Sequence, residues 1–135
     1  MSEDWVRDIA GMHKYYGVNE KVNDFDAEKL QQFLDFRMSF LDEELTETKN
    51  AVKRKDAEEI VDGLIDLCVV AIGTLDAMGV DSHEAWTQVL RANLAKEVGI
   101  KPERPNPLGL PDLIKPAGWK APSHAKNHGL LSKLK

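Results

Sequence analysis

Residues 40–75 read FLDEELTETKNAVKRKDAEEIVDGLIDLCVVAIGTL, and this stretch decides the fold. Its first part repeats apolar and acidic residues three and four positions apart, which is the spacing of an amphipathic helix. Its last part, from Ile60 to Leu75, is almost entirely apolar. Only the short link KRKDA lies between the two parts. The stretch therefore predicts two long helices that pack as an antiparallel hairpin.

Apolar periodicity predicts four helices in all, at about residues 3–16, 27–53, 57–78 and 82–98. Gly17 and Gly79 are suited to end the first and third helices. Asp26 and Asp81 are suited to begin the second and fourth, because an aspartate at this position accepts a hydrogen bond from a free backbone N–H. Residues 18–24 are predicted to form a loop.

The C-terminal part of the chain, residues 99–135, has a different composition and holds all six prolines. A long helix cannot pass through such a segment, and no convincing alternating strand pattern occurs anywhere in the chain. The predicted fold is all-α, an antiparallel helical hairpin or four-helix bundle with an irregular proline-rich C-terminal arm. The predicted boundaries are a helical domain at 1–98 and an arm at 99–135, which is part of the same domain or a lid.

The charge balance limits the partners of the protein. The net charge is −5, from 18 basic and 23 acidic residues, which argues against a nucleic-acid or anionic-membrane binder, because phosphate surfaces favour an excess of Lys and Arg. The start of the chain lacks a signal-peptide pattern, and no apolar run approaches the roughly 20 residues of a membrane span. We expect a cytoplasmic protein.

Acidic residues gather on the two hairpin helices. They are Glu43, Glu44 and Glu47 on the first, and Glu59, Asp62 and Asp66 on the second. With 3.6 residues per turn, each set lies on one side of its helix, so an antiparallel hairpin allows the two sets to face each other. An ordinary explanation is a solvated acidic face, and Glu59 is also placed to cap its own helix.

Asp62 and Asp66 are harder to explain in this way, because they lie inside the apolar run. A buried carboxylate is normally paired or bound to a metal, and few basic residues lie nearby. Mg²⁺ and Mn²⁺ prefer oxygen ligands, and Mg²⁺ is often shared with substrate phosphates. The residues therefore predict a buried carboxylate site for Mg²⁺ or Mn²⁺ between the two helices.

Two other metal sites fit less well. A di-iron bundle uses Glu-x-x-His pairs, and no histidine of this chain has a glutamate three residues before it. A zinc site needs clustered His and Cys side chains, and the chain has one cysteine and four scattered histidines.

The sequence resembles the MazG-like all-α nucleoside triphosphate pyrophosphohydrolases, which include the phosphoribosyl-ATP pyrophosphohydrolases and all-α dUTPases. Their signature is E-E-x-x-E on one helix and E-x-x-D on the next. Residues 43–47, EELTE, match the first half. Residues 59–62, EIVD, match the second half literally, but the apolar run that follows Asp66 fits the family better. Gly63 then stands where the family has glutamate, and Asp62 replaces it, as in phage-type members.

This resemblance implies a set of site residues. The metal ligands are Glu44, Glu47, Asp62 and Asp66, with Glu43 and Glu59 close behind, and Glu43 or Glu47 is the general base. Whether Glu59 and Asp62, or Asp62 and Asp66, complete the site stays open. Asn93 and Lys96, three residues apart on one helix face, match the family's substrate contacts, although an exposed helix end explains them equally well.

Further substrate candidates are Arg37 and Arg91, as phosphate contacts, and Lys115 and Trp119 in the arm. In LPDLIKPAGWKAP, residues 110–122, the arm is similar to that of phage relatives. Lys115 and Trp119 are suited to close over a nucleotide by charge and stacking. The alternative is an arm that packs on a neighbouring subunit, anchored by Trp119.

The resemblance implies an enzyme that splits a nucleoside triphosphate, in particular a deoxynucleotide, into the monophosphate and pyrophosphate with Mg²⁺ or Mn²⁺. Control of dGTP or dATP pools in a phage is a finer form of this prediction. Two alternatives are an inactive nucleotide-binding or regulatory module and a purely structural bundle. The apolar helix faces and the resemblance also predict a homodimer or homotetramer.

Overall fold

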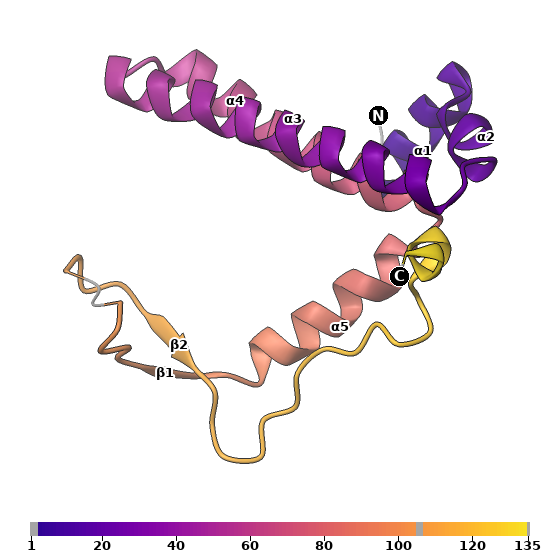
Figure 1. Ribbon diagram of the computed structural model, residues 1–135. Helices are drawn as coiled ribbons and strands as arrows, with labels where there is room; N and C mark the ends of the chain where they lie inside the picture. The colour runs from indigo at the N-terminus through magenta and orange to yellow at the C-terminus, as the bar shows by residue number, and fades with distance from the viewer. Residues whose placement is uncertain (1–2, 105–106, 135) are drawn as a thin grey trace. The chain divides into compact units, whose positions relative to one another are not determined.

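The structure is a computed structural model that describes residues 3–104 and 107–134 (Figure 1). Its elements are α1 (Trp5–Tyr16), α2 (Val18–Asn23), α3 (Ala27–Arg54), α4 (Ala57–Ala77), α5 (Ser82–Leu94), β1 (Glu97–Gly99), β2 (Asp112–Ile114) and the 3-10 helix η1 (Gly129–Lys133). The predicted all-α class is confirmed, because helices dominate and the two strands have three residues each.

The described chain divides into two compact units. The first unit runs up to Ser82 and resumes at Asn127, and the second unit is His83–Lys126. The first unit therefore contains α1 to α4 and η1, and the second contains most of α5, the two strands and the proline-rich segment.

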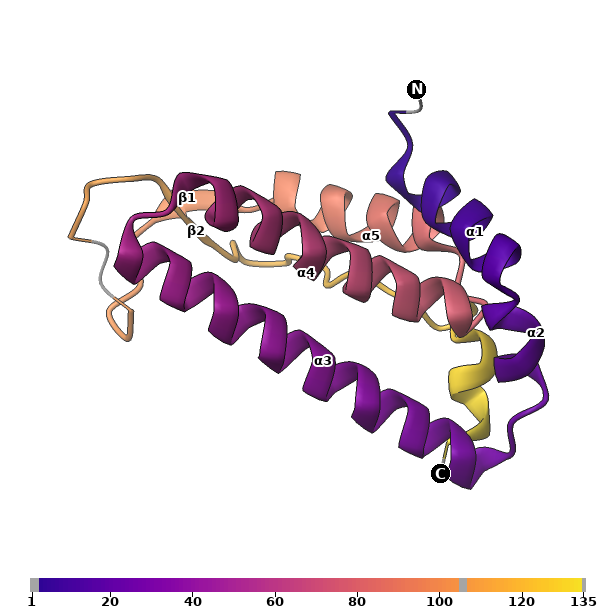
Figure 2. The same ribbon diagram turned by 90° about the horizontal axis from the view of Figure 1, so that it is seen from above.

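The α3–α4 hairpin is the main element of the first unit, and its two helices lie side by side along their length (Figure 2). The cap predicted at Asp26 is present, since Asp26 accepts a hydrogen bond from the backbone N–H of Lys29 at 2.8 Å. Asp56 caps α4 in the same way, accepting a hydrogen bond from the backbone N–H of Glu59 at 3.2 Å. Lys55 makes the turn between the helices with a positive φ of 59°. The predicted hairpin is confirmed, and its helix boundaries agree with the expectation within one residue.

The core of the first unit lies where α3 begins and α4 ends. Its buried apolar residues are Val22, Leu30, Ala77 and Met78. The C-terminal η1 helix covers this core, since the Leu130 N–H donates to the Met78 carbonyl oxygen at 2.7 Å and Leu130 packs against the cluster. The η1 helix thus covers the end of the hairpin that is opposite the turn between α3 and α4.

The loop predicted at residues 18–24 is wrong, because Val18–Asn23 forms α2. Gly17 has a left-handed backbone conformation (φ 69°) that ends α1 and allows a second helix to begin at once. Val18 and Val22, one turn apart, both pack into the core. This tertiary contact stabilises a helix that is too short to be stable by itself.

The prediction that the fourth helix reaches residue 98, and that the chain has no strand, is also wrong. α5 ends at Leu94, and Glu97–Gly99 pairs antiparallel with Asp112–Ile114. The Ile114 side chain lies directly over Gly99, where an added Cβ would be 2.6 Å from its Cδ1 atom. Strands of three residues are too short to show alternation, and their partners are separated by a proline-rich loop.

The second unit holds its C-terminal segment against α5. The Trp119 indole N–H donates to the Ala92 carbonyl oxygen at 2.7 Å, and the Ser123 N–H donates to Gln88 Oε1 at 3.3 Å. The arm is therefore not an independent tail, and Trp119 anchors it to the helix of its own chain.

Within the described ranges, no single helix has the length and apolar composition of a membrane span; α4 and α5 satisfy both conditions only when counted together across the break between them.

Candidate functional site

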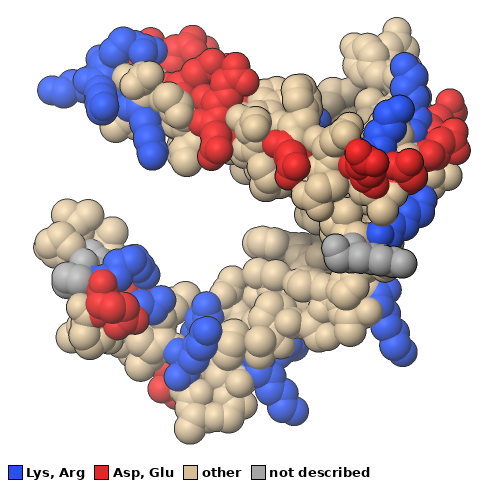
Figure 3. All heavy atoms as spheres, viewed as in Figure 1, with Lys and Arg blue, Asp and Glu red and all other residues tan. Residues whose placement is uncertain are grey.

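Five carboxylates of the hairpin form an electrostatic cluster around Glu44. The pKa of Glu44 is raised, first by its partial burial and then by the negative charges of four neighbours: Asp66, Glu47, Glu43 and Asp62. These neighbours come from both helices, so the predicted meeting of the two acidic sets is present in the fold. Figure 3 shows acidic side chains gathered along the hairpin, beside the basic side chains near its turn.

The helices approach each other closely beside this cluster. Gly63 of α4 is buried against Thr48 of α3, and a Cβ at residue 63 would lie 3.1 Å from Thr48 Cβ and collide with Thr48 Oγ1. The Thr48 hydroxyl donates to the Glu44 carbonyl oxygen at 2.7 Å. Since Glu44 is one turn before Thr48 and Asp66 one turn after Gly63, this contact sets the spacing between the two acids.

The expected burial of the two aspartates is wrong for Asp62. Asp62 is exposed and Asp66 is half-buried. The reason is that α4 is covered on only part of its circumference, so that Val61, Leu64 and Ile65 beside the aspartates are exposed as well. Residues inside the apolar run of α4 are therefore not all buried in the core.

Glu59, predicted as a further metal ligand, does not belong to the group of charges around Glu44. It is exposed in the first turn of α4, and it is not among the charges that raise the pKa of Glu44. Among the described His, Cys, Asp and Glu side chains, no three converge as a ready-made metal site. The cluster thus has the donor chemistry that a hard cation prefers, with its side chains spread along two helix faces.

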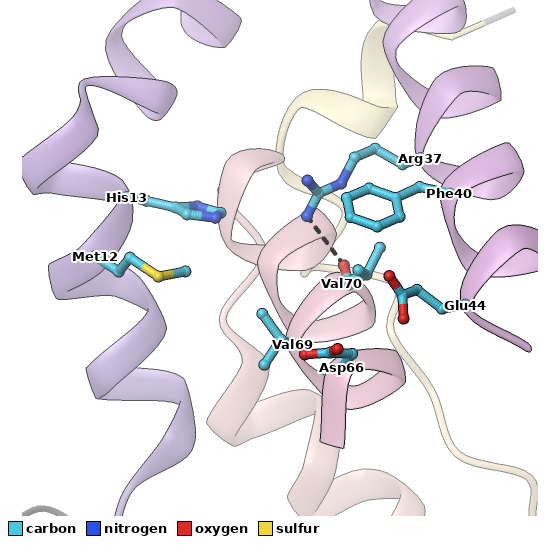
Figure 4. A pocket seen from close by; sticks show the side chains of 8 residues that line it. All are labelled: Met12, His13, Arg37, Phe40, Glu44, Asp66, Val69 and Val70. Atoms are coloured by element: carbon cyan, nitrogen blue, oxygen red, sulfur yellow. Dashed lines mark hydrogen bonds between the residues drawn. The ribbon is translucent and has the colours of Figure 1, made fainter. Parts of the chain in front are cut away.

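A pocket of about 310 Å³ opens next to the cluster (Figure 4). Its lining comes from three helices: Met12 and His13 of α1, Arg37, Phe40 and Glu44 of α3, and Asp66, Val69 and Val70 of α4. Glu44 and Asp66 lie at one end, while His13 and Arg37 point toward one another at the other end. The pocket therefore joins an acidic end to a basic end through apolar walls.

Arg37, a predicted phosphate contact, is half-buried in this pocket. Its Nε donates to Thr74 Oγ1 at 2.9 Å and its Nη2 donates to the Val70 carbonyl oxygen at 3.1 Å. Burial lowers the pKa of the Arg37 guanidinium. Among the described residues, no carboxylate oxygen lies within 4.0 Å of the Arg37 guanidinium, so Arg37 lines the pocket without an ion pair.

The other predicted substrate residues, Arg91, Asn93, Lys96, Lys115 and Trp119, belong to the second unit. The expectation that Asn93 and Lys96 share a helix face is wrong, because α5 ends at Leu94 and Lys96 lies in the turn that follows. Lys96 and Lys115 instead lie over the Trp119 ring, at 5.5 and 5.0 Å from its centroid. Arg91 donates to the Ala121 carbonyl oxygen at 3.4 Å, and Asn93 is exposed.

The sequence did not reveal the histidine side of the pocket. His13 is 6% exposed, and its Nδ1 lies 2.8 Å from Asp76 Oδ2. Asn19 Nδ2 also donates to Asp76 Oδ2, at 3.1 Å. The histidine and the aspartate are 63 residues apart, so no local spacing connects them, and the only sequence signal is a third aspartate on the apolar helix.

The chain was compared with known proteins. No curated protein matches it. The sequence model of the phosphoribosyl-ATP pyrophosphohydrolase family matches residues 18–93, which is more than half of the chain and includes α2, α3 and α4. This family implies pyrophosphohydrolase activity on nucleotides, and the chain belongs to it and thereby to the MazG-like all-α nucleoside triphosphate pyrophosphohydrolases.

Proposed function

We propose that the protein hydrolyses a deoxynucleoside triphosphate to the monophosphate and pyrophosphate, with Mg²⁺ or Mn²⁺ as cofactor. The observation that carries the proposal is the cluster of Glu44 and four neighbouring carboxylates at one end of a pocket of about 310 Å³. The family match over both hairpin helices supports the reaction type.

The residues proposed to hold the metal are Glu44, Glu47, Asp62 and Asp66, with Glu43 in reserve. They fit a divalent cation, because Glu44 is destabilised as an anion by four like charges that a cation would offset. When bound, such a cation supplies charge neutralisation for the phosphates and makes water more acidic. We place Glu59 outside this set because it does not act on Glu44.

The chain's own side chains would supply the proton transfer. Water attacks the α-phosphorus, and the bond to the oxygen bridging the α- and β-phosphorus breaks as pyrophosphate leaves. Glu43 and Glu47 are exposed on α3 beside the cluster, where either one is suited to accept the proton of the attacking water. Both have the free acceptor oxygens that an ionised carboxylate offers.

The basic residues would stabilise the phosphates. Arg37, predicted as a phosphate contact, lines the end of the pocket away from Glu44 and Asp66. We therefore give this role to Lys96 and Lys115 of the second unit, which present two ammonium groups on one indole ring. Positive groups of this kind stabilise charge that develops on a leaving pyrophosphate. We keep Arg91, Asn93 and Trp119 as further substrate contacts.

We also propose that the active form is a homodimer or homotetramer. Large apolar side chains are exposed on both hairpin helices: Phe36, Met38, Leu45 and Val52 on α3, and Val61, Leu64 and Ile65 on α4. Such a patch on a soluble chain usually marks an interface. A second copy on α4 would lie next to Asp62 and increase the burial of the acidic cluster.

The test is a panel of the common deoxynucleoside and ribonucleoside triphosphates, assayed for monophosphate and pyrophosphate with Mg²⁺, with Mn²⁺ and with a chelator. The proposal expects pyrophosphate from at least one nucleotide and none in the chelator. Hydrolysis that persists in the chelator, or release of orthophosphate only, contradicts it. Preference for dATP or dGTP is the finer form, which comes from the resemblance to phage-type members.

The second candidate is a nucleotide-binding or regulatory module without turnover. Two observations favour it: no three described ligands converge as placed, and Gly63 stands where the family has glutamate. This candidate expects metal-dependent nucleotide binding in a titration while the panel yields no pyrophosphate.

A further inference from the structure

The basic end of the pocket contains a polar group that the proposed reaction does not use. His13 is almost fully buried at 6% exposure, and its ring lines the pocket (Figure 4). Its Nδ1 is held by Asp76, whose Oδ2 also accepts a hydrogen bond from Asn19. A buried histidine held from behind in this way presents its second ring nitrogen in a fixed direction.

That direction is toward the ligand space. An ionised carboxylate only accepts hydrogen bonds, so Nδ1 carries the hydrogen and the Nε2 atom of a neutral ring is an acceptor. Nε2 has no hydrogen-bond partner among the described residues, and it lies 3.1 Å from the point where a Cβ on residue 73 would start. Among the described residues, the enclosed polar atoms without a partner are Asn19 Oδ1, Ser82 Oγ and Asp112 Oδ2, and Nε2 is not one of them. Nε2 is therefore accessible from the pocket that His13 lines, where a ligand can donate a hydrogen bond to it.

Arg37 offers the complementary donor at the same place. Its Nη2 lies 2.7 Å from the same Cβ point above Gly73. Two hydrogen bonds to Thr74 and Val70 fix the guanidinium and leave some of its five N–H groups free. An acceptor from His13 and a donor from Arg37 therefore face one small space.

Gly73 allows both side chains to lie close to α4 at this point. A Cβ at residue 73 would be 2.7 Å from Arg37 Nη2 and 3.1 Å from His13 Nε2, so any other residue would displace them. The walls are apolar, from Met12, Phe40 and Val69. An apolar slot with one fixed acceptor and one fixed donor matches the edge of a nucleobase, which carries N–H groups next to ring nitrogens or carbonyl oxygens.

The length of the pocket agrees with a nucleotide. Arg37 precedes Glu44 by seven residues on α3, and Asp66 precedes Gly73 by seven on α4, so the acidic and basic ends are about 10 Å apart along the helices. That is comparable with the reach from the α-phosphate of a nucleotide to its base. A volume of about 310 Å³ lies at the small end of ligand pockets and suits one nucleoside.

We propose that this pocket binds the nucleoside half of the substrate, and that His13 accepts a hydrogen bond from a base N–H while Arg37 donates one to a neighbouring acceptor of the base. His13 is then a specificity-determining residue, and Asp76 is the positioning residue behind it. The proposal deepens the proposed function and rests on it for the identity of the ligand as a nucleotide.

The test measures binding of the four deoxynucleoside monophosphates to the full chain in a chelator, by titration calorimetry. Two variants are compared with the wild type: Gly73→Ala, whose Cβ forces the Arg37 and His13 side chains to shift, and His13→Leu, which removes the acceptor. Circular dichroism checks that each variant is folded. A third variant, Glu44→Gln, changes only the acidic end.

The expected result is that the wild type binds at least one monophosphate, and that Gly73→Ala and His13→Leu each weaken this binding about tenfold or more. Binding of inorganic triphosphate with Mg²⁺, which has no base, should stay within about twofold in both variants because it uses the acidic end. Glu44→Gln should show the opposite pattern.

Three results would overturn the proposal: no monophosphate binds the wild type, a folded Gly73→Ala binds as well as the wild type, or both ligands weaken equally. If His13→Leu does not fold, the binding result for Gly73→Ala decides alone. If neither variant folds, NMR of the wild type decides: the proposal requires the His13 ring signals to shift when monophosphate is added and to stay in place when inorganic triphosphate is added. Failure of the proposed function is separate, because it is read from pyrophosphate release and leaves the monophosphate titration interpretable.

Discussion

Gly63 of α4 and Thr48 of α3 are in direct contact, and the space between them does not accommodate a side chain at residue 63. The resemblance to the family signature assigns a glutamate to the position of Gly63. In this chain a glutamate there would push the two helices apart next to the acidic cluster. Asp62, one position earlier and exposed, places a carboxylate on the hairpin without disturbing the contact.

Gly63→Ala is therefore expected to lower the free energy of unfolding by about 1–3 kcal/mol, because overpacking a tight contact forces helices or rotamers to shift. Urea unfolding followed by circular dichroism measures the change. The matched control is Gly11→Ala in α1, where an added Cβ meets nothing within 4 Å, so helix propensity should leave stability unchanged or slightly increased. Equal effects of the two substitutions would contradict the close contact.

The raised pKa of Glu44 makes the stability of the metal-free protein depend on pH. A carboxyl group with a raised pKa in the folded state stabilises the fold below its unfolded pKa, and this contribution is lost as the pH rises through the raised folded value. Glu44→Gln should therefore raise the Tm in a chelator at pH 7 by on the order of 2 °C, with no gain at acidic pH. Differential scanning fluorimetry measures it.

A suitable control for this charge effect is Glu58→Gln. Glu58 is an exposed acid in the first turn of α4 and is not among the charges that act on Glu44. A negative charge near a helix N-terminus is favourable, so its removal should lower the Tm slightly or leave it unchanged. A gain in both variants would mean that general charge reduction, and not the cluster, is responsible.

Substitution can decide whether Glu59 and Asp62, or Asp62 and Asp66, complete the metal site. Asp66→Asn is expected to reduce Mg²⁺-dependent pyrophosphate release roughly 100-fold or more and to remove the Mg²⁺-dependent rise in Tm. Glu59→Gln should leave both nearly unchanged, because Glu59 lies outside the group of charges around Glu44. The reverse pattern would assign the site to Glu59 and Asp62.

Trp119 is expected to hold the C-terminal segment against α5. Trp119→Phe removes the N–H that donates to the Ala92 carbonyl oxygen and should increase opening of the segment about fivefold, as for the loss of about 1 kcal/mol. Limited trypsin digestion measures the rate of cleavage after Lys120. Trp86→Phe is the control, since Trp86 lies on α5 and is 62% exposed. Equal cleavage rates in the two variants would contradict the role of Trp119 in holding the segment against α5.

The apolar surface of α4 provides a test of assembly. Leu64→Glu puts a charge in the exposed apolar patch of the hairpin and should convert the proposed dimer or tetramer into single chains, because a buried unpaired charge is costly. Light scattering after size exclusion measures the molar mass. Tyr15→Glu on α1, also exposed, should leave the mass unchanged, and a wild type that is monomeric at tens of micromolar would end the proposal.

The sequence by itself determined the hairpin, its caps and the acidic residues on its two helices. These follow from local rules: periodicity gives the helices, aspartates begin them, glycines and a short link turn the chain. Asp26 caps α3 as expected because a cap needs only residues three positions away, and Asp56 caps α4 by the same local rule. The family match at residues 18–93 agrees with the same local pattern.

Only the tertiary structure decided which of these residues are buried and what lies opposite them. Asp62 is exposed although its neighbours are apolar, since burial depends on what covers a helix and not on its composition. α2 and the β1–β2 pair form through contacts with distant parts of their own unit, and the pairing of His13 with Asp76 joins residues 63 positions apart. Helical spacing places a side chain on a face, whereas packing alone decides what that face meets.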